Sequence, residues 1–167
     1  MKYTSAQANK LLRQLQEERN ALLIEESQGS SFIAATIEDV ESVRPAYDYA
    51  AVRNDLGAVE AKIRKVKHAI NTFNLTHCPE GFDMTVDQIL VLLPQLTDRK
   101  NRLSRMANVL PKTRIEGNQR TNIIEYRYIN YDLDRVRADL EAISALLIKV
   151  QLALDKLNTT DTMEIDI

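Results

Sequence analysis

The stretch LDRVRADLEAISALLIKVQLALDKL, residues 133–157, decides the fold of this chain. Its large apolar side chains follow one another at alternating intervals of three and four residues: Leu133, Val136, Leu140, Ile143, Leu147, Val150, Leu154 and Leu157. Because an α-helix turns once in about 3.6 residues, this spacing lines all of them up in one narrow stripe. The stretch therefore predicts a long helix that packs against a partner through that stripe.

Much of the same stretch occurs a second time, 84 residues earlier in the chain. Thirteen of the 30 positions from Tyr47 to Thr76 are identical to their downstream counterparts: Tyr47, Asp48, Val52, Arg53, Asp55, Leu56, Ala58, Ala61, Lys65, Val66, Ala69, Asn74 and Thr76. A shared heptad would repeat the apolar residues, but it does not explain the repeated Arg53, Asp55 and Lys65. We interpret the match as an internal duplication.

The segment ahead of each long helix repeats as well, at an offset of 81 residues. Eight of the 20 positions from Thr4 to Leu23 recur: Thr4, Gln7, Leu11, Leu12, Gln14, Leu15, Asn20 and Leu22. In each copy a threonine is followed three residues later by a glutamine, the pattern of a helix capping box. Repeat 1 then covers about residues 4–76 and repeat 2 about residues 85–160.

The remaining elements are predicted from local signals. Helices are expected to start after Thr4, to run over about residues 46–73 with Pro45 in the first turn, and to start after Thr85. The helix over residues 46–73 has its own heptad stripe, which consists of Val52, Leu56, Val59, Ile63, Val66, Ile70 and Phe73. Pro94 predicts a kink or a helix restart, because proline lacks the backbone N–H donor that a helix interior needs. Short strands are expected in the two connectors, at residues 30–37 and 122–131, and the tail 162–167 has a strand-like composition.

These elements predict a mainly α fold in a single domain of residues 1–167. Two copies of a helical hairpin can bury their stripes as an elongated four-helix antiparallel bundle with pseudo-two-fold symmetry. Short β-strands in the two connectors complete this fold.

Two charged residues interrupt the apolar stripes at equivalent points, Arg19 and Lys100. A buried charge without a partner is costly, so one interpretation pairs Arg19 with Asp55 and Lys100 with Asp139. The alternative is that both cations extend along their aliphatic stems and stay in water.

Composition limits the classes of function. The net charge is −2. The chain has a single cysteine, Cys78, which excludes an intrachain disulfide, so a reducing compartment is the simplest interpretation. The first ten residues lack the apolar segment of a signal peptide, and the longest strongly apolar run, residues 89–93, is far too short to span a bilayer. We therefore expect a cytoplasmic protein without a membrane-embedded segment.

No residue pattern indicates catalysis, a cofactor or a metal. His77 and Cys78 are adjacent and His68 is the other histidine, so the ligand spacing of a zinc site is missing. No nucleophile-elbow or phosphate-loop motif occurs. The sequence predicts a protein that is not an enzyme.

One basic stretch stands out in the second half, between residues 99 and 120. Its cations are Arg99, Lys100, Arg102, Arg105, Lys112, Arg114 and Arg120, against one acid, Glu116. Tyr126, Tyr128 and Tyr131 follow closely, and cations with aromatic neighbours could hold a phosphate backbone and stack on bases. The stretch could equally be a solvated face that acids elsewhere balance. A polyanion site would use Arg99, Arg102, Arg105, Lys112, Arg114 and Arg120.

Three segments resemble a family of small uncharacterised helical bacterial proteins that are sometimes called septicolysin-like. They are KVKHAINTFN (residues 65–74), residues 85–103, and KVQLALDKLNTT (residues 149–160). Members share an order of short motifs whose nearest matches here are ERNAL at residues 18–22, AIN at residues 69–71 and TDR at residues 97–99. The family has no established activity, so the resemblance implies a helical fold and no catalytic residue.

Three functions therefore stay open on the sequence alone. The first is a non-enzymatic structural or interaction protein that binds a protein partner or associates with itself as a homodimer. The second is a binder of nucleic acid or another polyanion through the basic stretch. The third, an enzyme with its site in the bundle centre, would need inward carboxylates or histidines, and the stripes contain none.

Overall fold

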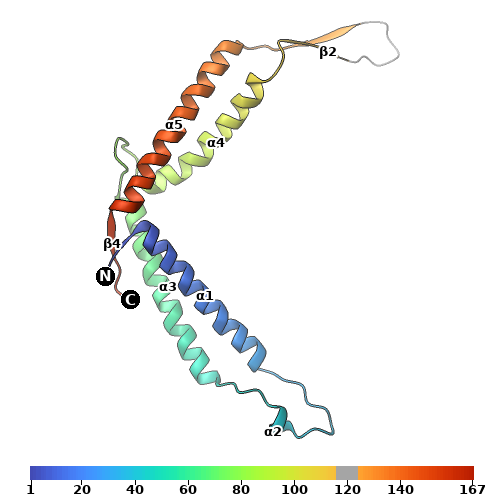
Figure 1. Ribbon diagram of the computed structural model, residues 1–167, viewed down its shortest axis with the longest axis vertical. Coiled ribbons are helices and arrows are strands. Elements are labelled where there is room, and N and C mark those ends of the chain that lie inside the picture. Colours follow the sequence, from blue (N-terminus) through green and yellow to red (C-terminus); the bar gives the residue numbers. More distant parts are fainter. Residues whose placement is uncertain (116–123) are drawn as a thin grey trace. The chain divides into compact units, whose positions relative to one another are not determined.

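The computed structural model describes residues 1–115 and 124–167 (Figure 1). The chain divides into two compact units. Unit 1 consists of Met1–His77 together with Leu157–Ile167, and unit 2 of Cys78–Lys156. The described residues are mainly helical, with short antiparallel strands, as the sequence predicted.

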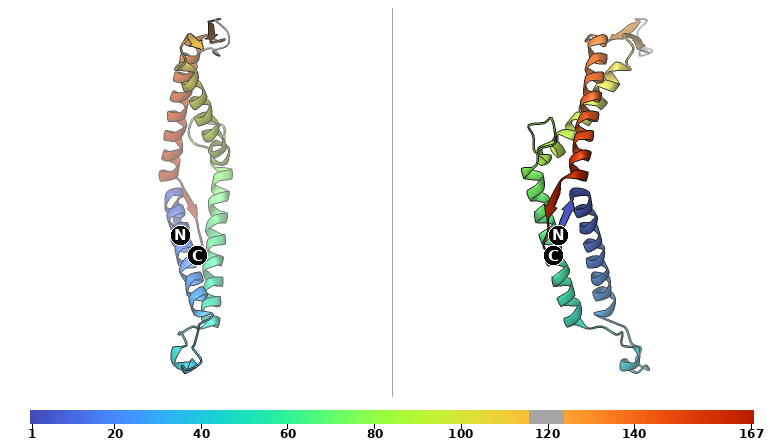
Figure 2. Two further views of the ribbon diagram at one scale, coloured as in Figure 1. Left: turned by 90° about the vertical axis from the view of Figure 1, so that its right-hand side faces the viewer. Right: turned by 60° about the vertical axis from the view of Figure 1, so that its left-hand side comes forward.

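Unit 1 is built on two helices that lie side by side, α1 (Ser5–Gly29) and α3 (Tyr49–Thr76) (Figures 1 and 2). The connector between them contains one short helix, α2 (Val40–Val43). At the other end of the hairpin, strand β1 (Lys2–Thr4) pairs antiparallel with β4 (Thr162–Glu164). The amino group of Met1 extends this ladder by donating to the carbonyl of Ile165 at 2.9 Å.

Unit 2 repeats the order of helix, connector and long helix. Its helices are α4 (Val86–Ala107) and α5 (Leu133–Thr160), which run side by side in both figures; the last residues of α5, from Leu157, belong to unit 1. The connector carries a two-stranded antiparallel ribbon of β2 (Lys112–Ile115) and β3 (Glu125–Tyr128). The hydroxyl of Tyr131 donates to the carbonyl of Met106 at 2.9 Å and so ties the two helix ends together.

The apolar stripes lie where the heptad pattern placed them. The buried side chains of α3 are Val52, Val59, Val66, Ile70 and Phe73, and those of α5 are Val136, Leu147, Val150, Leu154 and Leu157. Every other member of the two stripes is half-buried. Met163 and Ile165 of the tail add to the core of unit 1, so the tail closes the end of that hairpin.

Both predicted capping boxes are present. The hydroxyl of Thr4 accepts from the backbone N–H of Gln7 while the Gln7 amide oxygen accepts from the N–H of Thr4, and Thr85 and Gln88 do the same for α4. These bonds satisfy backbone donors that the first turn of a helix leaves free. Asp48 caps α3 in a different way, accepting from the N–H groups of Ala50 and Ala51.

Several local predictions are wrong. Residues 31–35 have no regular structure, because none of the described strands lies beside them to complete a ladder, so the expected strand at residues 30–37 does not form. Pro45 lies ahead of α3 rather than in its first turn, since Asp48 supplies the cap and the helix starts at Tyr49. Of the two outcomes expected at Pro94, the restart does not occur, because α4 is continuous through this residue, and the kink stays a prediction. The strand predicted at residues 122–131 is confirmed over Glu125–Tyr128, and residues 122 and 123 lie outside the described part.

The predicted register pairs are also wrong. The Nε of Arg19 lies 2.8 Å from an Oε of Glu60, so Glu60 and not Asp55 is its partner. The packing of α1 against α3 sets this pair, because it places Glu60 opposite Arg19. Lys100 and Asp139 are both exposed, and no ion pair joins them in the described structure, which agrees with the alternative that this cation stays in water.

Candidate polyanion-binding surface

The ribbon in the connector of unit 2 gathers two cations and two aromatic rings on one face. Lys112 lies opposite Tyr128, and Arg114 lies opposite Tyr126. Because alternate residues of a strand point to the same side, and directly opposed residues share a face, these four side chains lie together. All four are exposed to solvent. Thr113, Ile115, Glu125 and Arg127 occupy the opposite face, which carries mixed charge.

The lysine on this face lies against the rings. The Nζ of Lys112 is 4.0 Å from the centre of the Tyr126 ring and 5.5 Å from that of Tyr128. The two rings are 6.4 Å apart and tilted by 52°. A cation above a ring face is attracted by the negative potential of its π system, so the rings hold the ammonium group in place. The result is a small surface that offers positive charge next to flat apolar rings.

The other basic residues predicted for a polyanion site lie on α4 or outside the described part. Arg99, Arg102 and Arg105 occupy the C-terminal half of α4, are exposed, and make no ion pair with a described residue. Arg120 lies outside the described residues. The structure therefore brings Lys112 and Arg114 together with the tyrosines and places three arginines on the adjoining helix of the same unit. Lys62, Arg64, Lys65 and Lys67 belong to α3 and hence to unit 1.

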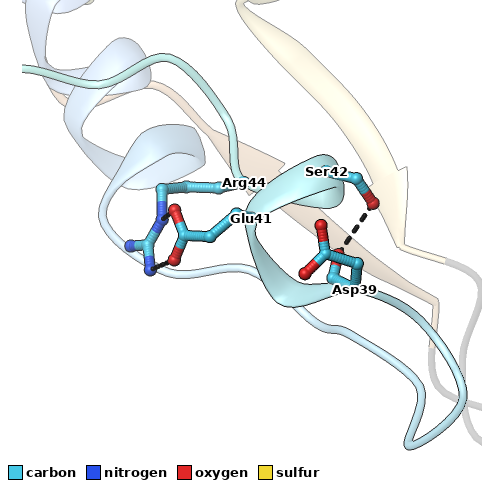
Figure 3. Close-up of polar contacts among 4 residues, drawn as sticks. All are labelled: Asp39, Glu41, Ser42 and Arg44. Atoms are coloured by element: carbon cyan, nitrogen blue, oxygen red, sulfur yellow. Dashed lines mark hydrogen bonds and ion pairs between the residues drawn. The ribbon is translucent and has the colours of Figure 1, made fainter.

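The connector of unit 1 occupies the same place in its hairpin as the β2–β3 ribbon does in unit 2, but its charge is mainly acidic. Figure 3 shows its short helix α2, where Glu41 and Arg44 form two parallel bonds of 2.7 and 2.9 Å and the Ser42 hydroxyl donates to the Asp39 carbonyl. The hydrogen bond and charge of Arg44 lower the pKa of Glu41, and the same hydrogen bond and the charge of Glu41 raise the pKa of Arg44. Glu38 accepts from the backbone N–H of Ala35 and closes the preceding turn.

Large apolar side chains point into water at this same end. Ile33 and Ile37 are each 96% exposed, and Val40 and Val43 are exposed beside them on α2. The connector begins where Gly29 ends α1 under the ring of Tyr47. A Cβ on Gly29 would lie 2.6 Å from that ring, so a glycine is needed for this close approach. Burial of Tyr47, followed by the charges of Glu26 and other neighbours, raises its pKa.

Unit 1 also carries a groove that the sequence did not indicate. It has a volume of about 470 Å³ and lies between the last turns of α3 and the tail: Lys65, His68, Ala69, Thr72, Phe73, Thr76, His77, Met163, Glu164, Ile165 and Asp166. The His77 ring stacks on Phe73 with 4.0 Å between ring centres, and its Nδ1 lies 3.1 Å from the Phe73 carbonyl. The tail forms one wall, and only its long-range pairing with β1 brings it there.

No group of three or more metal-binding side chains occurs among the described residues. Cys78 is exposed, next to His77 in sequence, and its thiol makes no bond in the described structure. Within residues 1–115 and 124–167, no helix is long and apolar enough to cross a membrane.

Comparison with known proteins gives a fold relative and no family. A scan against protein-family models and a search of curated proteins find no match to this chain. Among solved structures, the chain is similar to the crystal structure of a functionally unknown conserved protein from Corynebacterium diphtheriae, with a TM-score of 0.60 and 14% sequence identity. The match covers 98% of this chain and 100% of the other, so the likeness is one of overall fold.

Proposed function

We propose that this chain is a non-enzymatic interaction protein, built from a duplicated helical hairpin, that binds a protein partner through an exposed hairpin end. The observation that carries this proposal is the connector of unit 1, where Ile33 and Ile37 are almost wholly in water. Soluble proteins seldom leave neighbouring large apolar side chains exposed unless another molecule covers them. The duplication supports a scaffold role, because each half contributes the same order of helix, connector and long helix.

The proposed duplication rests on the sequence identities together with the two equivalent capping boxes. Packing of the two hairpins as a four-helix bundle stays a prediction, as do the single domain and the resemblance to septicolysin-like proteins. None of these is needed for the binding surface, which lies within unit 1.

Replacing both isoleucines with serine, Ile33→Ser together with Ile37→Ser, is expected to remove partner binding while the fold is kept. Both side chains make no core contact, so the helical circular dichroism signal and the melting temperature should be unchanged. Binding is measured by chemical cross-linking of the tagged chain in its native extract, followed by the mass of the products. A control is Leu75→Ser, at another exposed apolar site, on α3, where the side chain is 60% exposed.

Cross-linked products that disappear in the double variant and persist in the control are the expected result. Identical products from all three chains would contradict a role for this connector.

A second function, binding of single-stranded nucleic acid, is favoured by the cation and ring face of the β2–β3 ribbon. Tyr126 and Tyr128 offer surfaces on which bases stack, and Lys112 with Arg114 offers charge for the phosphates.

We expect the full chain to bind a fluorescent single-stranded oligonucleotide at low salt, with affinity that falls steeply as salt is raised. Tyr126→Ala with Tyr128→Ala should weaken this binding at least about tenfold, since stacking contributes about 1–3 kcal/mol per base. No change in fluorescence anisotropy at low salt would exclude this function.

A further inference from the structure

The two connector ends of the chain carry opposite charge. We define the acidic tip as residues 17–55 and the basic tip as residues 98–115 and 124–139. The acidic tip has nine Asp and Glu against three Lys and Arg, a net charge of −6. The basic tip has nine Lys and Arg against five Asp and Glu, a net charge of +4. A net charge of −2 for the whole chain therefore conceals a strong separation of charge.

Both tips also expose apolar side chains. On the acidic tip these are Ile33, Ile37, Val40, Val43 and Tyr49, and on the basic tip they are Val109, Leu110, Ile115, Ile124, Tyr126 and Tyr128. Interfaces between proteins combine an apolar centre, which supplies affinity, with a charged rim that selects and orients the partner. Each tip has both components, and their charges have opposite sign.

We propose that the partner of this chain is a second copy of itself, and that the acidic tip of one copy docks on the basic tip of the next. This inference rests on the proposed function and names its partner. The contact joins two different surfaces, so it is heterologous, and repeated contacts of this kind link copies into rings or chains. The free carboxylate of Asp39 and the exposed Glu25 face the partner from the acidic tip, and Arg102 and Arg114 do so from the basic tip.

The test reverses two charged side chains on each tip, which takes the acidic tip from −6 to −2 and the basic tip from +4 to 0. One variant combines Glu25→Lys with Asp39→Lys, and the other combines Arg102→Glu with Arg114→Glu. None of these side chains makes a hydrogen bond or ion pair in the described structure, so each variant should fold, which circular dichroism checks. Self-association is measured by sedimentation velocity over a range of concentrations at about 25 mM and about 300 mM salt, because exposed charges are screened over shorter distances at the higher salt.

The wild-type chain is expected to associate at low salt and to dissociate as salt is raised. Each variant alone should associate about tenfold more weakly or worse, since the reversed side chains meet side chains of the same sign and the net attraction between the tips falls. An equal mixture of the two variants should recover association, because the unaltered basic tip of one variant then meets the unaltered acidic tip of the other. A chain that carries all four substitutions should recover it as well.

Two controls separate tip complementarity from net charge. Glu41→Arg with Arg44→Glu inverts an ion pair inside the acidic tip without changing its charge, and association should persist. Lys62→Glu with Lys67→Glu changes the net charge as much as Arg102→Glu with Arg114→Glu does, on exposed positions of α3 outside residues 17–55. It should also leave association in place.

Three results would overturn the proposal: a wild-type chain that sediments as a monomer at every concentration, association that is indifferent to the reversals, or variants that do not recover on mixing. If the monomeric chain still forms cross-links to a different protein that need Ile33 and Ile37, self-docking is wrong and the interaction function stands. If those cross-links are missing too, both the self-docking and the interaction function are wrong. If the monomer binds a single-stranded oligonucleotide through Arg102 and Arg114, the basic tip serves a polyanion instead.

Discussion

Phe73→Ala is expected to lower the free energy of unfolding by about 3–5 kcal/mol, the range for removing a buried aromatic side chain. Phe73 is 2% exposed, belongs to the apolar stripe of α3, and stacks on His77. It also lines the groove beside the tail, so its loss weakens the contact that closes the end of unit 1. The free energy of unfolding of a native protein is only about 5–15 kcal/mol, so this loss would remove a large part of the stability.

Denaturant unfolding followed by circular dichroism measures this effect. The matched control is Leu75→Ala, two residues further along α3, where the side chain is 60% exposed. We expect a change within about 0.5 kcal/mol there, as for most surface substitutions. Equal losses for the two variants would show that Phe73 does not belong to a core.

Val150→Asp is expected to destabilise the hairpin of unit 2 by about 3–5 kcal/mol, because it buries a charge that has no partner. Val150 is fully buried in the middle of the α5 stripe. A carboxylate at this position must either lose its water or remain protonated, and both raise the free energy of the folded state. Its destabilising effect should diminish at acid pH, where the neutral form costs less to bury.

The neighbouring substitution Gln151→Asp provides the control, since that position is exposed on the same helix turn. Thermal unfolding of both variants at neutral and acid pH separates burial of the charge from loss of helix propensity. A melting temperature for Val150→Asp that matches the control would contradict an inward-facing stripe.

The helices could be predicted from the sequence because their signals are local. Heptad spacing in Leu133–Leu157 and Val52–Phe73 fixes which side of each helix is buried, and the structure confirms both stripes. The capping boxes at Thr4 and Thr85 fix two helix starts for the same reason, because all their bonds lie within four residues. The composition of residues 122–131 likewise predicted a strand, which is confirmed over Glu125–Tyr128.

The remaining features depend on contacts between distant residues. Strand β1 has only three residues and forms because the tail, more than 150 positions away, lies beside it. The partner of Arg19 depends on which residue of α3 lies opposite it. Heptad spacing specifies the buried side of each helix but not this pairing between helices. Residues 30–37 have strand-like side chains, yet a strand needs a neighbour to bond with, and none lies beside them.

The candidate surfaces were only partly predictable. The basic stretch and its tyrosines were visible in the sequence, but the register that places Lys112 over Tyr126 required the paired strands. The exposed isoleucines of unit 1 lie in residues 30–37, whose composition predicts a strand and gives no sign that these side chains are in water. The groove along α3 needed the position of the tail, which sequence spacing does not give.

The central claim is that the chain contains one helical hairpin twice, and a pair of distance measurements tests it most directly. In a Cys78→Ser background, spin labels are placed at Arg19→Cys and Glu60→Cys in one chain, and at the equivalent sites Lys100→Cys and Ser144→Cys in another. Neighbouring helix axes lie about 8–10 Å apart, so both label pairs should give short and similar distances by electron spin resonance. A short distance in the first chain and a long one in the second would show that the halves do not share one hairpin.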